Sequence, residues 1–176
     1  MFSRPQVSII IPVYNMQDEL PKCLESVVCQ TFTDYEVLVI NDGSTDNTAQ
    51  IIQNFKEQHP HFMCLTQPNQ GVAAARNAGL LRAEGTYVCF LDGDDFLEPH
   101  FLQRMVSAAQ KTGAEVCLVP NAWRKGSSCI SCAIFSANKS VFPCGTKKPS
   151  VPSRIITSGR RPKNRGGGVP LPAPGI

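Results

Sequence analysis

Three carboxylates lie within four positions directly after an apolar run, in the segment FLDGDDF at residues 90–96. The side chains of Asp92, Asp94 and Asp95 repel one another, and no Lys or Arg lies nearby in the sequence to neutralise them. A divalent cation would do so, since Mg²⁺ and Mn²⁺ prefer oxygen ligands and often complete their coordination with phosphate oxygens. The cluster predicts a metal site for a diphosphate. The alternative is an acidic turn in which Asp94 and Asp95 favour the dipole of the next helix.

Polar residues also follow two other strand-like runs. The segment PVYN, residues 12–15, ends the first run, and the segment NDGSTD, residues 41–46, ends the second. Ligands of open α/β sheets bind at the carboxyl ends of the strands, so we expect the three polar segments to surround one crevice. A plain turn explains Gly43 and Ser44. It does not require Asp42, whose carboxylate suits recognition of the N–H of a base or of a sugar hydroxyl.

Short apolar runs and helical patterns alternate along the chain and must position these residues. Strands are expected at Val7–Ile11, Glu36–Ile40, Phe62–Leu65, Thr86–Leu91 and Glu115–Val119, and helices around 20–28, after Ser44, over 71–83 and over Phe101–Lys111. Ser44 is expected to cap the second helix, with Asp46 in its first turn. This order predicts an α/β fold with a mostly parallel sheet and helices on both faces.

The composition changes sharply after residue 123. Residues 1–123 hold 7 Lys and Arg against 14 Asp and Glu, whereas residues 124–176 hold 10 Lys and Arg and no acid. This second part is rich in Pro, Gly and Ser, which predicts a disordered, solvated tail. Peripheral contact of the basic tail with an anionic membrane is the alternative, and no specific nucleic-acid partner is expected.

Several classes of protein do not fit the sequence. No apolar stretch is long enough to span a membrane, and the run Val7–Ile11 is too short for a secretory signal, so we expect a cytoplasmic protein, peripheral at the inner face of the membrane where the tail binds lipid. The motifs of dinucleotide-binding folds and P-loops are absent. Cys129 and Cys132 form a CxxC without a second ligand pair. The cysteines expected to be small core residues are Cys23, Cys29, Cys64, Cys89 and Cys117.

The motifs together resemble the family 2 glycosyltransferases of GT-A fold. The matching segments are VSIIIPVYN, VLVINDGSTD, NQGVAAARNAGL and GTYVCFLDGDDFLEP, within residues 7 to about 119. The resemblance implies a Rossmann-like GT-A fold and a partial nucleotide-sugar-binding domain over residues 1–123, followed by the tail over 124–176. The nucleotide-sugar-binding residues it implies are Pro12, Tyr14, Asn15, Asp42, Asp46, Gly71, Arg76, Asp92 and Asp94.

The resemblance also implies a reaction. Asp92 and Asp94 resemble the DxD motif, with Asp95 beside it, and all three would hold Mn²⁺ or Mg²⁺. The donor would be a nucleotide sugar, UDP-linked, and an inverting transfer would deliver the sugar to a glycan or lipid-linked acceptor in surface polysaccharide synthesis.

The family's catalytic base lies well downstream of the DxD motif. Glu115 is the last acidic residue of this sequence. The base is therefore unassigned, and we expect a truncated form that is weakly active or inactive. Two alternatives stay open. One is a catalytically dead nucleotide-sugar-binding or partner protein, and the other is a nucleotidyltransferase, which usually carries a Gly-rich N-terminal loop.

Overall fold

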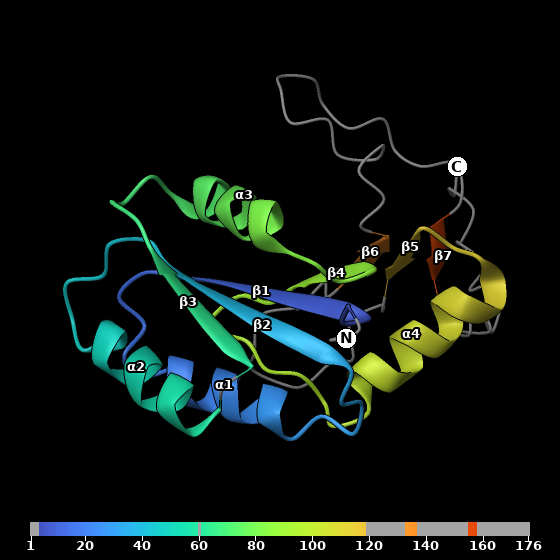
Figure 1. Cartoon of the computed structure of the whole chain (residues 1–176), viewed down its shortest axis with the longest axis horizontal. Helices are drawn as coiled ribbons and strands as arrows, with labels where there is room; N and C mark the ends of the chain where they lie inside the picture. The colour runs from blue at the N-terminus through green and yellow to red at the C-terminus, as the bar shows by residue number, and fades with distance from the viewer. Residues whose placement is uncertain (1–3, 60, 119–132, 137–154, 158–176) are drawn as a thin grey trace, which may run out of the picture.

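The computed structural model describes residues 4–59, 61–118, 133–136 and 155–157 (Figure 1). Its strands are β1 (Val7–Val13), β2 (Tyr35–Asn41), β3 (Phe62–Thr66), β4 (Tyr87–Phe90), β5 (Val116–Leu118), β6 (Ala133–Ser136) and β7 (Ile155–Thr157). Its helices are α1 (Leu20–Val28), α2 (Thr48–Gln58), α3 (Val72–Arg82) and α4 (Phe101–Thr112). Every strand and helix expected from the sequence is present, with small shifts at the ends. The predicted α/β fold is therefore confirmed.

All the strands belong to one sheet, in the order β3-β2-β1-β4-β6-β5-β7. The first four strands are parallel, and β1 lies between β2 and β4. Strand β6 is antiparallel to both β4 and β5, and β7 is parallel to β5. Helix α3 covers one face of the sheet, and α1, α2 and α4 cover the other (Figure 1).

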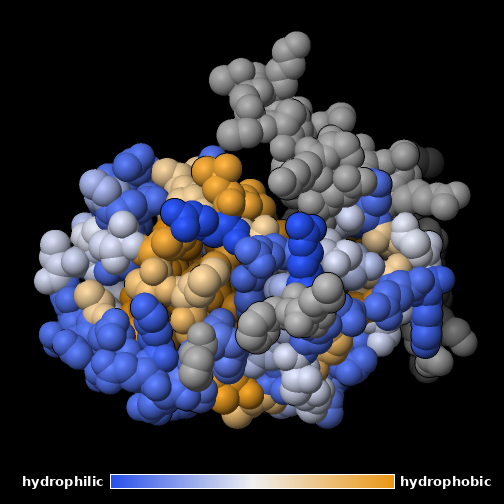
Figure 2. Space-filling model, viewed as in Figure 1, coloured by the Kyte–Doolittle hydropathy of each residue, from blue (hydrophilic) through white to orange (hydrophobic). Residues whose placement is uncertain are grey.

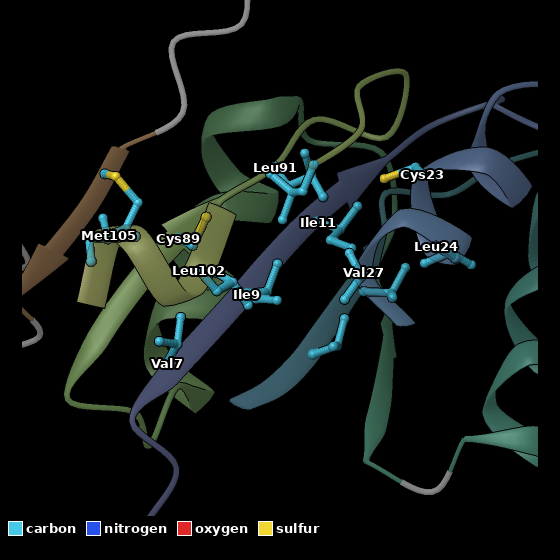
Figure 3. Close-up of a cluster of buried hydrophobic side chains, with 14 of the residues drawn as sticks. Val7, Ile9, Ile11, Cys23, Leu24, Val27, Cys89, Leu91, Leu102 and Met105 are labelled. Atoms are coloured by element: carbon cyan, nitrogen blue, oxygen red, sulfur yellow. The ribbon is translucent and has the colours of Figure 1, made fainter. Parts of the chain in front are cut away.

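The core lies on both faces of β1. Figure 3 shows Val7, Ile9 and Ile11 beside side chains of α1 and α4. The intervening Ile10 packs on the opposite face with Ala75 of α3. Every residue of β1 is buried, which explains why apolar and polar residues do not alternate along it; the one polar side chain, Ser8, is buried too and is hydrogen-bonded to Glu36 and Gly85. In the space-filling view, hydrophilic residues cover α2, and hydrophobic residues show between α2 and α3 (Figure 2).

One expectation about a helix start is wrong, and so is the alternative considered for the acidic turn. Helix α2 begins at Thr48 after an N-cap at Asn47, so Ser44 does not cap it and Asp46 precedes its first turn. Helix α4 begins at Phe101 and has no acidic residue in its first turn. The acidic turn at 92–95 therefore does not stabilise the start of α4. Ser44 binds Asn15 instead, whereas Asp46 accepts the N–H of Thr48 from its position just before α2.

Part of the segment expected to be a tail belongs to the sheet. Strand β6 inserts between β4 and β5, and its Ile134 is 1% exposed. The short apolar runs of β6 and β7 are too brief to stand out against a Pro- and Gly-rich composition. The rest of the predicted tail lies outside the described residues, as does the CxxC pair.

Three of the five cysteines expected in the core are buried. Cys23, Cys89 and Cys117 are buried, Cys64 is half-buried, and Cys29 is exposed. The expectation is wrong for Cys29, because it lies at the C-terminal cap of α1 and not on the helix face that packs on the sheet. No helix within the described ranges is long and apolar enough to cross a lipid bilayer.

Close packing of α3 on the sheet depends on Gly79, and this generates a prediction. A Cβ atom at position 79 would lie 2.5 Å from Cγ2 of Ile10, which is fully buried. We expect Gly79→Ala to lower the free energy of unfolding by about 1–3 kcal/mol, because overpacking outweighs the gain in helix propensity. Urea denaturation measures this. The control Asn77→Ala, at an exposed position of the same helix, should leave stability unchanged or raise it slightly, and equal effects would contradict the packing argument.

Candidate functional site

The carboxyl ends of β1, β2 and β4 meet at one edge of the sheet. Val13 is in register with Asn41 of β2, and Ile10 is in register with Phe90 of β4. The polar segments that follow these strands therefore start side by side, as the sequence predicts. Their hydrogen bonds show how each segment is held.

The loops after β1 and β2 are joined by hydrogen bonds through Asn15. Its φ angle is +52°, a conformation that Asn tolerates better than most residues. The Asn15 N–H donates to Ser44 Oγ at 3.0 Å, and Asn15 Oδ1 accepts the N–H of Thr45 at 2.8 Å. Asn15 thus holds the two loops together, and the Ser44 hydroxyl serves this contact.

Asp46 makes a second connection between the same loops. Its Oδ2 accepts the N–H of Gln17 at 3.2 Å, and its Oδ1 accepts the N–H of Thr48 at 3.0 Å. Burial raises the pKa of Asp46, but the hydrogen bonds from Thr48 and Gln17 outweigh burial and hold the pKa below its ordinary value. Asp46 is therefore ionised at neutral pH and positions both loops.

Asp42 is buried and holds the loop between β3 and α3. Its Oδ1 accepts from Gln67 Nε2 at 2.7 Å and from the N–H of Gln70 at 3.0 Å, and its Oδ2 accepts the N–H of Gly71 at 2.7 Å. Burial raises the pKa of Asp42, but the three hydrogen bonds together lower it by more, so the pKa lies below its ordinary value. Both carboxylate oxygens thus bind protein donors, and a base N–H would have to share or replace one of these bonds.

Arg76 pairs with the first carboxylate of the acidic loop. Its NH2 atom lies 2.6 Å from Asp92 Oδ1, and its guanidinium lies over the ring of Phe90 at 5.7 Å. Arg76 Nε is buried and has no hydrogen-bond partner among the described residues. The half-buried Asp92 is thus already neutralised by a protein cation, which the sequence analysis did not foresee.

The remaining carboxylates of the acidic loop have no such partner. Asp94 is exposed and forms no hydrogen bond or ion pair with the described residues. Burial, followed by the charges of Asp94 and Asp92, raises the pKa of Asp95 to about 6. The loop lies against the end of β1, since a Cβ atom at Gly93 would be 2.9 Å from Cγ1 of Val13. The structure therefore presents an under-neutralised pair of carboxylates at the sheet edge.

This arrangement allows a specific test of the predicted metal site. Among the described residues, no three His, Cys, Asp or Glu side chains converge as a metal site, so Asp92, Asp94 and Asp95 do not form a closed cage. A Mg²⁺-type site needs one or two carboxylates, with water and phosphate oxygens as the other ligands. Asp94 is free to supply one, and the charges of Asp94 and Asp92 add to the effect of burial in raising the pKa of Asp95. The donor set fits an open divalent site that a diphosphate completes.

The other predicted site residues lie at the same edge. Pro12 is buried at the end of β1, and Tyr14 is 44% exposed just beyond it. Gly71 precedes α3 with a φ angle of +87°, which favours glycine, and donates its N–H to Asp42. The structure brings every predicted site residue to one edge of the sheet.

The sequence analysis missed the segment after β3. Gln67 and Gln70 bind Asp42, yet only the ends of the first, second and fourth strands were singled out. The signal was present, because residues 67–70 form the polar segment QPNQ directly after a strand. The same reasoning applied to the third strand would have included them.

A parallel sheet with polar segments gathered at its carboxyl edge defines an α/β protein of the kind that binds nucleotides there. The Glycosyl transferase family 2 model matches residues 8–128, and the chain belongs to that family. It is 40% identical over 116 residues to the glycosyltransferase YibD of Escherichia coli K12, covering 66% of this chain and 34% of YibD. It is 36% identical over 142 residues to the chondroitin synthase of Pasteurella multocida, covering 81% of this chain and 13% of that protein. The chain spans about a third or less of these relatives.

Solved structures agree on the fold. Residues 1–349 of Staphylococcus aureus TarS, solved with UDP-GlcNAc, match with a TM-score of 0.65 and 28% identity over 70% of this chain and 36% of that one. The mannosyltransferase PcManGT of Pyrobaculum calidifontis, solved with GDP-Man and Mn²⁺, matches with a TM-score of 0.63 and 21% identity over 76% of this chain and 45% of that one. The predicted GT-A-like fold is confirmed.

The buried hydrogen bonds of Asp42 generate a pH-dependent prediction. We expect Asp42→Asn to lower the free energy of unfolding at pH 7 by about 1–3 kcal/mol, because an amide NH₂ would face N–H donors of the loop. The pKa of Asp42 is lowered, so its stabilisation is present above its ordinary value of 3.8 and is lost as pH falls through the folded pKa. Denaturation at several pH values should therefore show the difference shrinking below pH 3.8.

The exposed Asp18 provides the matched control, because it forms no hydrogen bond with the described residues. Asp18→Asn should change stability by less than about 0.5 kcal/mol. A loss of unfolding free energy in Asp42→Asn that stays constant from neutral to strongly acidic pH would contradict the stabilising role of the ionised Asp42 carboxylate.

Proposed function

We propose that this domain binds the nucleotide-sugar donor of a family 2 glycosyltransferase, with UDP as the nucleotide and a divalent cation at the acidic loop. The observation that carries the proposal is the meeting of four polar segments at the carboxyl edge of β1, β2, β3 and β4. Family membership and the likeness to TarS, which was solved with UDP-GlcNAc, support it. They also favour a glycosyltransferase over a nucleotidyltransferase.

The proposed donor site divides into a base side and a phosphate side. On the base side, the ionised Asp42 would accept the N–H of uracil by sharing or replacing one of the bonds that it now receives from Gln70 and Gly71. Tyr14 is exposed beside it and offers a ring for stacking. On the phosphate side, Arg76 and the acidic loop lie next to each other.

The phosphate side combines a protein cation with a metal site. Asp94, with Asp92 and Asp95 beside it, would hold Mn²⁺ or Mg²⁺, which would stabilise the charge on a departing diphosphate. Arg76 neutralises Asp92 and keeps its guanidinium at the edge where phosphate oxygens would lie. In a full-length protein, the acceptor would be a glycan or a lipid-linked sugar of a surface polysaccharide.

The first functional prediction is that UDP binding requires metal. Calorimetry should show UDP binding in Mn²⁺ and its loss in EDTA, because the diphosphate would otherwise face unneutralised carboxylates. Asp94→Ala should weaken binding in Mn²⁺ by about tenfold or more.

The control is Glu57→Ala, which removes an exposed carboxylate of α2 that belongs to none of the polar segments of the proposed site. This variant should bind UDP normally. GDP and ADP in parallel titrations test the choice of base. Equal UDP binding with and without EDTA would overturn the metal assignment, and preference for another nucleotide would overturn the assignment of uridine.

We further expect the 176-residue chain by itself to transfer sugar poorly. Transfer needs a base that takes the proton of the acceptor hydroxyl, and residues 116–176 contain no Asp or Glu. Loss of a general base costs about 10²- to 10⁴-fold in rate. Asp95 is a poor substitute, because a bound cation would hold it ionised and lower its pKa.

Turnover is measured with nucleotide sugars and a panel of candidate acceptors, with donor hydrolysis recorded separately. The expected result is slow or absent transfer by a chain that still binds donor. Transfer at about 1 s⁻¹ or faster, an ordinary enzymatic rate, would contradict this expectation.

A further inference from the structure

The turn after α1 holds the segment that follows the acidic loop. Ser26 Oγ accepts the N–H of Leu97 at 3.0 Å, and the N–H of Thr31 donates to Pro99 O at 2.9 Å. Between them, Gln30 contacts the same segment. These three residues, which we call the α1 clamp, bind four backbone groups of residues 97–102.

Gln30 is the clamp residue whose side chain joins α1 to α4. It is only 6% exposed. Its Nε2 donates to Ser26 O at 3.1 Å and to Glu98 O at 2.8 Å, while its Oε1 accepts the N–H of Leu102 at 3.1 Å. One amide thus satisfies a carbonyl of the last turn of α1 and an N–H of the first turn of α4, neither of which has a partner within its own helix.

The chemistry of these contacts requires a glutamine. Glutamate has the same shape but lacks both donors, and it would place a negative charge against two carbonyl oxygens. Methionine has a similar length but would leave Ser26 O and the N–H of Leu102 without partners, while Glu98 O would keep only the N–H of Phe101. Buried polar groups without partners are costly, so either substitution should shift or loosen the backbone of residues 97–102.

The clamp also acts close to the carboxylates. Leu97, held by Ser26, lies two residues after Asp95, and the acidic turn is closed by the bond from the Asp95 N–H to Asp92 O at 3.0 Å. On the other side of the turn, Cys23 Sγ of α1 lies 3.6 Å from Asp92 O. Helix α1 and the turn after it therefore fix the acidic loop from both ends.

We propose that Gln30 is a positioning residue for the donor site: through the α1 clamp it sets the place of Asp94 and so controls metal-dependent binding of the diphosphate. This inference rests on the proposed function, because it assigns the clamp a role in metal-dependent UDP binding. Gln30 itself touches neither metal nor nucleotide.

The experiment compares Gln30→Met with Gln53→Met, a control at an exposed position of α2. Calorimetry measures UDP affinity in Mn²⁺ and in EDTA for each variant, alone and combined with Asp94→Ala. Hydrogen exchange measures the protection of amides in residues 92–102 and in α2. We expect Gln30→Met to speed exchange in 92–102 only and to weaken Mn²⁺-dependent UDP binding by about tenfold.

The double variant separates positioning from general stability. If Gln30 acts through Asp94, Gln30→Met has no further effect on UDP affinity once Asp94 is Ala. Equal weakening with and without Asp94 would overturn the proposal, as would unchanged UDP binding in Gln30→Met. If Gln30→Met does not fold, Ser26→Ala removes one clamp contact and is subject to the same comparison.

The two proposals fail in different ways. Wild-type binding of UDP that is equal in Mn²⁺ and EDTA overturns the proposed function and the functional role of the clamp together. Normal metal-dependent UDP binding in the wild type and in Gln30→Met, with weakened binding in Asp94→Ala, overturns the clamp alone. Unchanged exchange of residues 92–102 in Gln30→Met also rejects the clamp, whatever the wild type binds.

Discussion

Complete burial of β1 between β2 and β4 is the constraint on which the rest of the structure depends. All seven residues of β1 are buried, so its two faces must be covered by helices and its two edges by strands. That requirement fixes the parallel registers and brings the ends of three strands to one edge. The helices follow from the same need, with α3 on one face and α1 and α4 on the other (Figures 1 and 3). The candidate site is a consequence of this alignment.

Hydrogen bonds to backbone groups then give the site its shape. Asp42 and Asp46 have lowered pKa values because each accepts several N–H groups, and each thereby holds loops that come from different strands. Asn15 joins two of these loops, and Gln30 fixes the segment after the acidic turn. These polar side chains therefore position the backbone of the site, while Asp94 remains exposed for a ligand.

Charge is distributed unevenly across the site. Arg76 neutralises Asp92 at 2.6 Å, but Asp94 and Asp95 have no cationic partner among the described residues. The chain supplies candidates for binding within residues 12–94, whereas it has no acidic residue after Glu115. Since the chain spans about a third or less of these relatives, the proposed donor binding is the property that experiments on it test most directly.

The sequence by itself determined the order of strands and helices up to β5, a mostly parallel sheet and the strand ends that carry polar residues. Hydrophobic periodicity and the polar residues at strand ends are local signals, which can be recognised from neighbouring residues alone. Only the tertiary structure decided that Ser44 binds Asn15 and caps no helix, that Arg76 pairs with Asp92, and that β6 inserts beside β4. These partners lie 29, 16 and about 47 positions apart, and such pairings arise when burial and hydrogen bonding are satisfied together across the whole sheet.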